Sequence, residues 1–197
     1  MKRFLMFVLC MFSLWACANP ANAQVRIGIT LNAPGVIFND TEQLEKLDNR
    51  LAELLPTDKY EVLPVQVLIQ KEKEYRRNKN IFQAPNQLTP QPLSMEALCE
   101  LGKDNKCDYI MTISMQAAEG KGGFLYVQGE KRMDLLTDLA ITDISTKTNV
   151  FQKKYKNGGM DAGPVLTRKQ GDAGKALVKA FDKFLKKLEI VPGKDIP

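Results

Sequence analysis

Residues 109–116 read Tyr109-Ile110-Met111-Thr112-Ile113-Ser114-Met115-Gln116, and this stretch indicates the fold more clearly than any other. From Met111 onward, large apolar side chains alternate with polar ones. Successive side chains of a β-strand point to opposite faces of the sheet, so the alternation predicts a strand with one buried face and one open face.

The same alternation predicts strands before and after this one. It occurs at residues 25–31 and 135–142, and a turn at 145–149 leads into a further strand at 150–156. Apolar residues at every second position also predict a strand at 63–69. Pro64 lies inside that segment, and because proline cannot donate to the strand ladder, this strand is expected at a sheet edge.

Helices are predicted between the strands by apolar residues spaced three or four apart, at 44–55, 95–102 and 176–188. The element order is therefore β-α-β-α-β-β-β-α. A strand covered on both faces is uniformly apolar, and none of these strands is. We expect an α+β protein with two layers, in which helices cover one face of a mixed five-stranded sheet. The open face is predicted to present Thr30, Thr112, Ser114, Gln116, Asp138 and Thr142.

The N-terminal residues 1–23 have the pattern of a secretory signal peptide. Lys2 and Arg3 precede an apolar run at 4–15, and Ala21-Asn22-Ala23 forms an A-x-A cleavage site. The run is shorter than the roughly 20 residues that span a bilayer. We expect cleavage after Ala23 and an exported protein, periplasmic or secreted, with no transmembrane span in the mature chain.

A second interpretation of the same segment stays open. Leu14-Trp15-Ala16-Cys17 resembles a bacterial lipobox, in which the cysteine is lipidated and becomes the first residue. Cleavage there would leave the protein lipid-anchored in the envelope through Cys17.

The remaining chain is long enough for a single α+β domain, predicted at residues 24–192. Residues 70–93 are dense in charge and then in proline, and we interpret them as a long surface connection. Residues 193–197 are expected to form a flexible tail.

Composition excludes several kinds of chemistry. The chain has no histidine, which removes Ser-His-Asp and Cys-His catalysis and nearly all zinc sites. We therefore predict no catalytic residues, no metal and no cofactor. Without Lys2 and Arg3 there are 26 basic and 23 acidic residues, a balance too even to indicate a nucleic-acid partner.

Two cysteines, Cys99 and Cys107, remain after cleavage. Close cysteines in an exported protein favour a disulfide, which here would join the end of a helix to the start of the next strand. The alternative is two separate buried thiols.

A family resemblance rests on Leu98-Cys99-Glu100-Leu101-Gly102, on Cys107-Asp108-Tyr109-Ile110-Met111-Thr112 and on Leu139-Ala140-Ile141-Thr142-Asp143-Ile144. With the element order, these segments resemble the α/β domain of several bacterial envelope proteins. They are the amino-terminal domain of the Tol–Pal periplasmic propeller protein, the curli secretion lipoprotein and the lipoprotein activators of penicillin-binding proteins. The resemblance implies contact with an envelope protein and no shared catalytic residues.

Two segments are predicted to contact that partner. Phe124 and Tyr126 lie in a loop at 117–132, which either extends the neighbouring strands or protrudes as a hairpin. Arg76 and Arg77 lie in a basic segment, which either docks an acidic partner or forms a solvated surface.

We therefore predict an exported bacterial envelope protein with a non-catalytic role in protein binding or assembly. One alternative is a small-ligand carrier with a pocket between sheet and helices. The other is a hydrolase that uses carboxylates or lysine. Against the hydrolase, Asp134 and Asp138 would lie about 13 Å apart along one strand, too far for an acid/base pair.

Overall fold

A computed structural model describes residues 24–81, 91–120, 130–162 and 171–196. The predicted signal peptide, the alternative lipid site at Cys17 and the loop residues Phe124 and Tyr126 lie outside the described residues.

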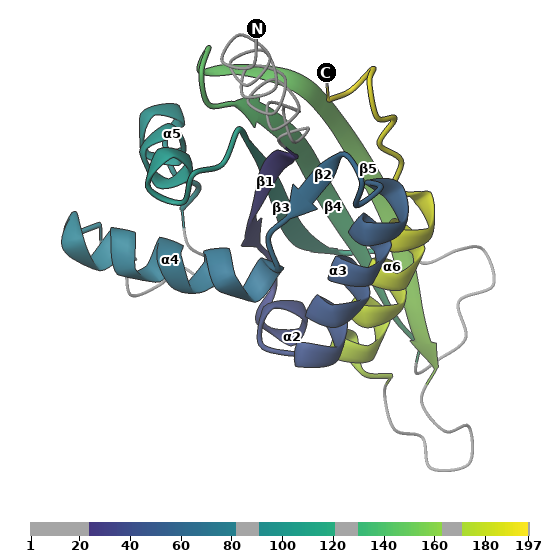
Figure 1. The fold of residues 1–197 in the computed structure, drawn as a ribbon. Coiled ribbons are helices and arrows are strands. Elements are labelled where there is room, and N and C mark those ends of the chain that lie inside the picture. The colour runs from purple at the N-terminus through teal and green to yellow at the C-terminus, as the bar shows by residue number, and fades with distance from the viewer. Residues whose placement is uncertain (1–23, 82–90, 121–129, 163–170, 197) are drawn as a thin grey trace, which may run out of the picture.

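Five strands form one mixed sheet, in the order β2-β1-β3-β4-β5 (Figure 1). β1 is parallel to both of its neighbours, β2 and β3, whereas β4 is antiparallel to both β3 and β5. The elements are β1 (Val25–Asn32), α2 (Gly35–Phe38), α3 (Thr41–Leu54), β2 (Tyr60–Val62), α4 (Val65–Asn78), α5 (Met95–Asp104), β3 (Tyr109–Glu119), β4 (Glu130–Asp143), β5 (Thr148–Ala162) and α6 (Ala173–Lys187). The predicted mixed sheet and element order are confirmed.

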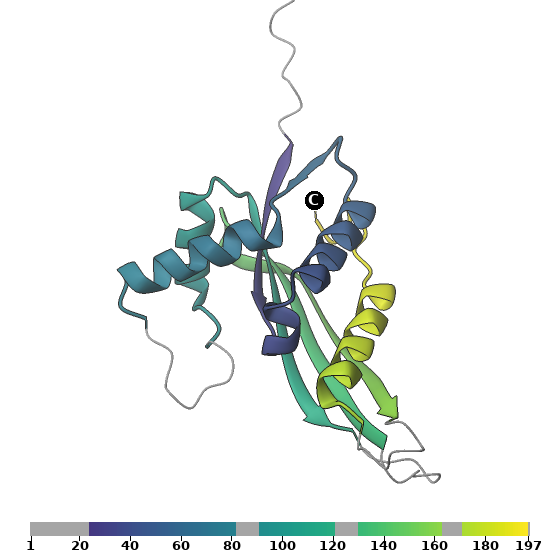
Figure 2. The same cartoon turned by 90° about the horizontal axis from the view of Figure 1, so that it is seen from below.

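The main core lies between one face of this sheet and the helices α2, α3 and α6 (Figure 2). The alternating apolar residues of β1, β3 and β4 supply the sheet side, and Leu47, Leu51, Phe181 and Phe184 supply part of the helix side. Phe181 and Phe184 are fully buried, as the sequence pattern of the last helix predicts. Tyr155 of β5 meets Phe184 edge-on, with ring centroids 5.3 Å apart.

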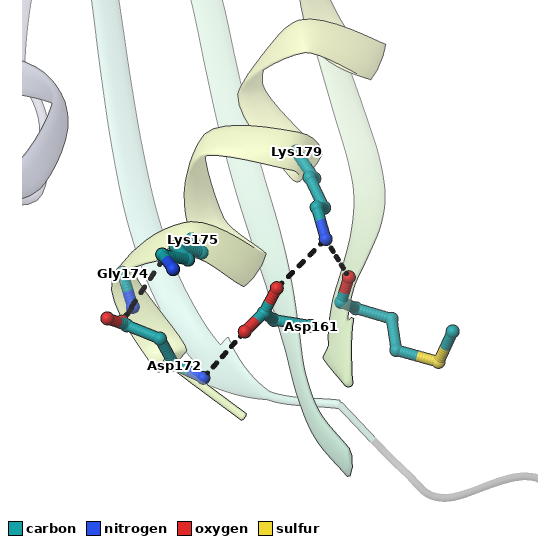
Figure 3. A network of polar contacts seen from close by, with 6 residues as sticks. Asp161, Asp172, Gly174, Lys175 and Lys179 are labelled. Atoms are coloured by element: carbon teal, nitrogen blue, oxygen red, sulfur yellow. Dashed lines mark hydrogen bonds and ion pairs between the residues drawn. The ribbon is translucent and has the colours of Figure 1, made fainter. Parts of the chain in front are cut away.

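α6 packs unusually close to β5 because Gly159 has no side chain. A Cβ at Gly159 would lie 1.8 Å from the carbonyl oxygen of Ala176. The start of the helix is fixed by the network in Figure 3. In this network the carboxylate of Asp161 accepts a hydrogen bond from the backbone N–H of Asp172 and forms an ion pair with Lys179. Asp172 in turn caps the helix by accepting the N–H groups of Gly174 and Lys175.

The prediction of a strand at residues 63–69 is wrong. The edge strand is Tyr60–Val62, and Val65 begins the helix α4. Pro64 stands at the N-cap of this helix, where its missing N–H costs no hydrogen bond. Val65, Leu68 and Ile69 are the buried residues of α4, at helical spacing. The first part of the predicted surface connection at 70–93 is therefore the second half of this helix.

A second, smaller cluster lies on the opposite face of the sheet. There Leu98 and Cys99 of α5 pack against Ile110 and Ile144, and Leu68 of α4 approaches Gly28 of β1. The expectation of helices on one face holds for α2, α3 and α6, whereas α5 covers the start of β3 from the other side (Figure 2). Ile110, an apolar residue on the otherwise polar side of the alternation, is the reason.

The predicted Cys99–Cys107 disulfide is not formed, and both cysteines are buried free thiols. Cys99 packs in the small cluster beneath α5. The sulfur of Cys107 instead lies 2.9 Å from the place where a Cβ of Gly28 would be. Burial raises the pKa of the Cys107 thiol to about 11. The alternative of two separate buried thiols is the correct one.

The tail predicted at 193–197 is integrated into the fold as far as residue 196. Ile196 is fully buried, and its carbonyl oxygen accepts a hydrogen bond from the hydroxyl of Tyr60. Burial of this side chain explains the difference. In the described part of the chain, no helix is both long enough and apolar enough to cross a membrane.

Candidate functional site

The candidate site is the face of β3, β4 and β5 that points away from the main core. Alternation along β3 and β4 places Thr112, Ser114, Gln116 and Asp138 there, as the sequence predicts, and all four line a groove of about 660 Å³. The remaining lining residues are Pro92, Leu136, Thr137, Ala140, Gln152, Lys154, Tyr155 and Lys156.

The open face is also expected to present Thr30 and Thr142, and the prediction that these two are exposed is wrong. Both are buried. Thr30 donates a hydrogen bond to the hydroxyl of Thr112, and Thr142 donates one to the side chain of Asn149. Thr142 pairs with Ile110, so it lies beside the residue that α5 covers.

The middle strand of the groove contains an exposed leucine that the sequence analysis missed. Leu136 is 40% exposed, although it lies in the middle of β4. It follows the fully buried Leu135 directly, so the two leucines point to opposite faces of the sheet. An apolar residue at a position that should be polar was the signal available in the sequence.

Charged side chains surround this leucine in cross-strand pairs. Lys154 lies opposite Asp138, with 3.8 Å between nitrogen and oxygen, and Gln152 donates to the same carboxylate. Lys156 lies 3.0 Å from Asp134. The two carboxylates are four residues apart on one strand, and each has its own lysine. The groove is therefore a shallow surface on which an exposed leucine lies between two charge pairs.

The predicted basic contact segment lies in α4, where most of its charges have partners within the chain. Arg76 forms an ion pair of 2.6 Å with Glu72 and donates to the carbonyl oxygen of Gln91. Lys79 pairs with Glu100 of α5. Arg77 is exposed and has no ion pair in the described part of the chain. Arg76 therefore fastens the segment before α5 to α4, and of the two predicted contact arginines Arg77 remains free to steer a partner.

The loop predicted at 117–132 is shorter in the structure. β3 continues to Glu119 and β4 begins at Glu130, and the ladder between them reaches the pair Glu119–Met133. Both ends of the predicted loop are therefore strand. Among the described residues, no group of three or more Cys, Asp and Glu side chains could hold a metal ion.

Comparison with known proteins gives structural neighbours only. No protein-family model matches this chain, and no curated protein matches it. Among solved structures, the chain is similar to the C-terminal domain of LpoB from Salmonella enterica, with a TM-score of 0.36, 16% identity and coverage of 73% of this chain and 90% of that one. It is also similar to lipoprotein GNA1162 from Neisseria meningitidis, with a TM-score of 0.42, 11% identity and coverage of 83% and 99%.

A further neighbour is the hypothetical protein CT253 from Chlamydia trachomatis, with a TM-score of 0.40, 10% identity and coverage of 84% and 95%. These neighbours match the architectural resemblance to lipoprotein activators that the sequence indicated. With identities and TM-scores this low, the likeness supports no conclusion about function.

Proposed function

We propose that this chain is an exported envelope protein that binds another protein through the open face of β3, β4 and β5 and catalyses no reaction. The observation that supports this function is the exposed Leu136 on the middle strand of the groove, between the ion pairs of Asp134 and Asp138. Apolar centres with a polar rim are typical of protein interfaces.

The small-ligand carrier is less well supported by the same surface. A carrier encloses most of its ligand in a pocket. Here the side chains of Lys154 and Lys156 are 77% and 68% exposed, so this wall of the groove is open to solvent.

The hydrolase is less well supported because its carboxylates do not converge. Asp134 and Asp138 are paired with different lysines and project from the same strand. A pair of carboxylates that cleaves a glycosidic bond lies on both sides of that bond.

The location belongs to the same proposal. Cleavage after Ala23 would release a mature protein that begins at Gln24, whereas lipidation would leave Cys17 as the first residue. Intact mass of the exported protein separates the two. If the mass shows a diacylglyceryl-modified chain, the protein is anchored in the envelope by lipid and is not a free periplasmic or secreted protein.

The binding role is tested by replacing Leu136 with glutamate. Burying the exposed part of this leucine in a complex is worth about 1 kcal/mol, and a buried, unpaired carboxylate adds a further penalty. We expect Leu136→Glu to lose a partner that the wild-type protein retains from envelope extract.

The matched control is Val67→Glu, because Val67 is 43% exposed and lies on α4, away from the groove. If both variants retain the same partners as the wild type, the groove is not the binding surface.

A further inference from the structure

β5 is an outer strand of the sheet, and the direction of its free backbone groups can be determined from the ladder. The N–H of Gly120 donates to the carbonyl of Arg132, so even-numbered residues of β4 face β3. Odd-numbered residues of β4 therefore face β5, and they pair with odd-numbered residues such as Asn157 and Tyr155. The backbone groups of even-numbered β5 residues consequently point outward.

Two side chains of α6 confirm this direction. Lys183 donates to the carbonyl oxygen of Gly158 at 2.7 Å, and Lys179 donates to that of Met160 at 3.1 Å. Figure 3 shows the second of these contacts. The helix thus covers the outward carbonyls at the C-terminal end of the strand.

The middle of the same edge has no such cover. The outward N–H and C=O groups belong to Gln152, Lys154 and Lys156, and none of them has a hydrogen-bond partner within the described ranges. The C-terminal segment is linked to this part of β5 through β5 side chains, by the Lys153–Glu189 ion pair and the bond from Glu189 N–H to the Tyr155 hydroxyl. Free backbone groups of this kind are a template for another strand.

Lysines line this edge from two elements. β5 contributes Lys153, Lys154 and Lys156, and α6 contributes a stripe at helical spacing that consists of Lys175, Lys179, Lys183, Lys186 and Lys187. All five lysines of the stripe are exposed. Four of them, Lys175, Lys183, Lys186 and Lys187, have no ion pair in the part of the chain that the structure describes. The edge therefore combines unpaired backbone groups with an excess of positive charge.

Two other occupants of this edge, a second copy of the chain and a membrane, are disfavoured. A second copy that paired β5 with β5 would bring the lysines of both edges together, and like charges across a strand pair are destabilising. Insertion into a membrane would need an exposed apolar face on α6, whereas Phe181 and Phe184 are fully buried in the core.

We propose that the edge of β5 at Gln152–Lys156 binds an extended, acidic segment of a partner protein as an additional strand. The backbone of that segment would pair with the outward groups of Gln152, Lys154 and Lys156. Its acidic side chains would face Lys154 and Lys156 on one side of the sheet and the lysine stripe of α6 on the other. This inference rests on the proposed protein-binding function and names the chemistry of the partner.

The lysines of β5 already have partners, but these partners can be exchanged. The lysine ends of the pairs with Asp138 and Asp134 are exposed to solvent, and ion pairs at a protein surface contribute little to stability. When a peptide adds to a sheet edge, the hydrogen bonds between backbones supply most of the affinity and the side chains supply the selectivity.

The test uses a fluorescent peptide of about seven residues, an ordinary strand length, in which glutamate alternates with valine. Fluorescence anisotropy measures its binding to the full mature chain. The matched control peptide has proline in place of each valine, so it keeps the charge and cannot form a ladder. We expect the valine peptide to bind at least about tenfold more tightly than the proline peptide, a difference of about 1.4 kcal/mol.

Two protein variants test the two halves of the proposal. Lys154→Pro removes one outward N–H and no bond to β4, and edge strands tolerate proline at such positions. This variant should bind the valine peptide at least about tenfold more weakly than the wild type, with a small change in the melting temperature of the protein. A Lys154→Glu, Lys156→Glu double variant keeps every backbone group and should exchange the preference, binding a lysine–valine peptide in place of the glutamate–valine one.

The proposal is overturned if the valine peptide does not bind, or if the proline peptide binds equally well. It is also overturned if Lys154→Pro keeps the wild-type affinity. Equal binding of both peptides with displacement by phosphatidylglycerol vesicles would identify a lipid-binding surface instead. Failure here leaves the proposed function intact if Leu136→Glu still loses its envelope partner, so the two failures are distinguishable.

Discussion

Replacing Gly159 by alanine should strongly destabilise this protein, although a glycine-to-alanine change at a compatible site commonly stabilises by about 0.4–1 kcal/mol. The sign is reversed here because a Cβ would lie 1.8 Å from the carbonyl oxygen of Ala176 and 2.7 Å from the nitrogen of Ala180. Real Cβ contacts are essentially never below 3.0 Å, so α6 must move away from β5 by about 1.2 Å.

The size of the loss in stability depends on which atoms must move to relieve the clash. Both contacted atoms are backbone, so no side-chain rotation relieves the clash, and the shift loosens the packing of Phe181 and Phe184 as well. Overpacking of a core costs about 1–3 kcal/mol, and we expect the upper end, about 3 kcal/mol, with a melting temperature lower by about 6–12 °C. Urea unfolding followed by circular dichroism measures it.

The neighbouring Gly158 provides the matched control. A Cβ there meets only the side chain of Asp134, at 3.1 Å, on the open face of the sheet. Gly158→Ala should therefore change the free energy of unfolding by less than about 1 kcal/mol. Equal losses for the two variants, or an unchanged stability in Gly159→Ala, would refute both the assigned faces of β5 and the close packing of α6.

Three further predictions concern the core, the thiols and acid stability. Phe184→Ala should cost about 3–5 kcal/mol in chemical unfolding, because the ring is fully buried; a loss below about 1 kcal/mol would contradict this burial. Cys99 and Cys107 should both resist iodoacetamide in the native protein at pH 8 and both react after denaturation, because burial raises the pKa of each thiol; a disulfide in the peptide map would contradict the free thiols. The pKa of Asp161 is lowered by the N–H of Asp172 and by a lysine of α6, so its stabilising effect is complete above about pH 4 and disappears as pH falls through the lowered pKa. Wild type should consequently lose more stability between pH 5 and pH 3 than Asp161→Asn, and parallel pH profiles would contradict this.

The strands with clear alternation could be predicted from the sequence because a one-residue shift would turn most of their apolar side chains to the wrong face. β1, β3 and β4 are of this kind. β5 continues beyond its predicted end at 156 to Ala162. Gly158 and Gly159 weakened the strand pattern there, although Gly159 is the residue that permits close contact with α6.

The segment after Pro64 could not be assigned by periodicity alone, because apolar residues there satisfy two patterns. Alternation selects Val65, Val67 and Ile69, and helical spacing selects Val65, Leu68 and Ile69. The structure decides for the helix, since Leu68 is fully buried and Val67 is 43% exposed. Periodicity alone does not indicate the surface on which the segment packs, and that surface decides between the two patterns.

The candidate site was predicted in part for a related reason. The polar residues of β3 and β4 could be assigned to the open face by their period. Ile110 and Leu136 both interrupt that polar face, yet α5 covers Ile110 and leaves Leu136 exposed. Only the tertiary position of α5 distinguishes an apolar residue that is covered within the chain from one that is free to bind a partner.

The central claim is that the open face of β3, β4 and β5 contacts another protein. Its most direct test is a photo-crosslinking amino acid placed at Leu136 in the exported protein, irradiated in living cells and compared with the same group at Val67. We predict a discrete cross-linked protein from Leu136 that is absent from Val67. Cross-links that are the same at both positions, or none at Leu136, would contradict the account.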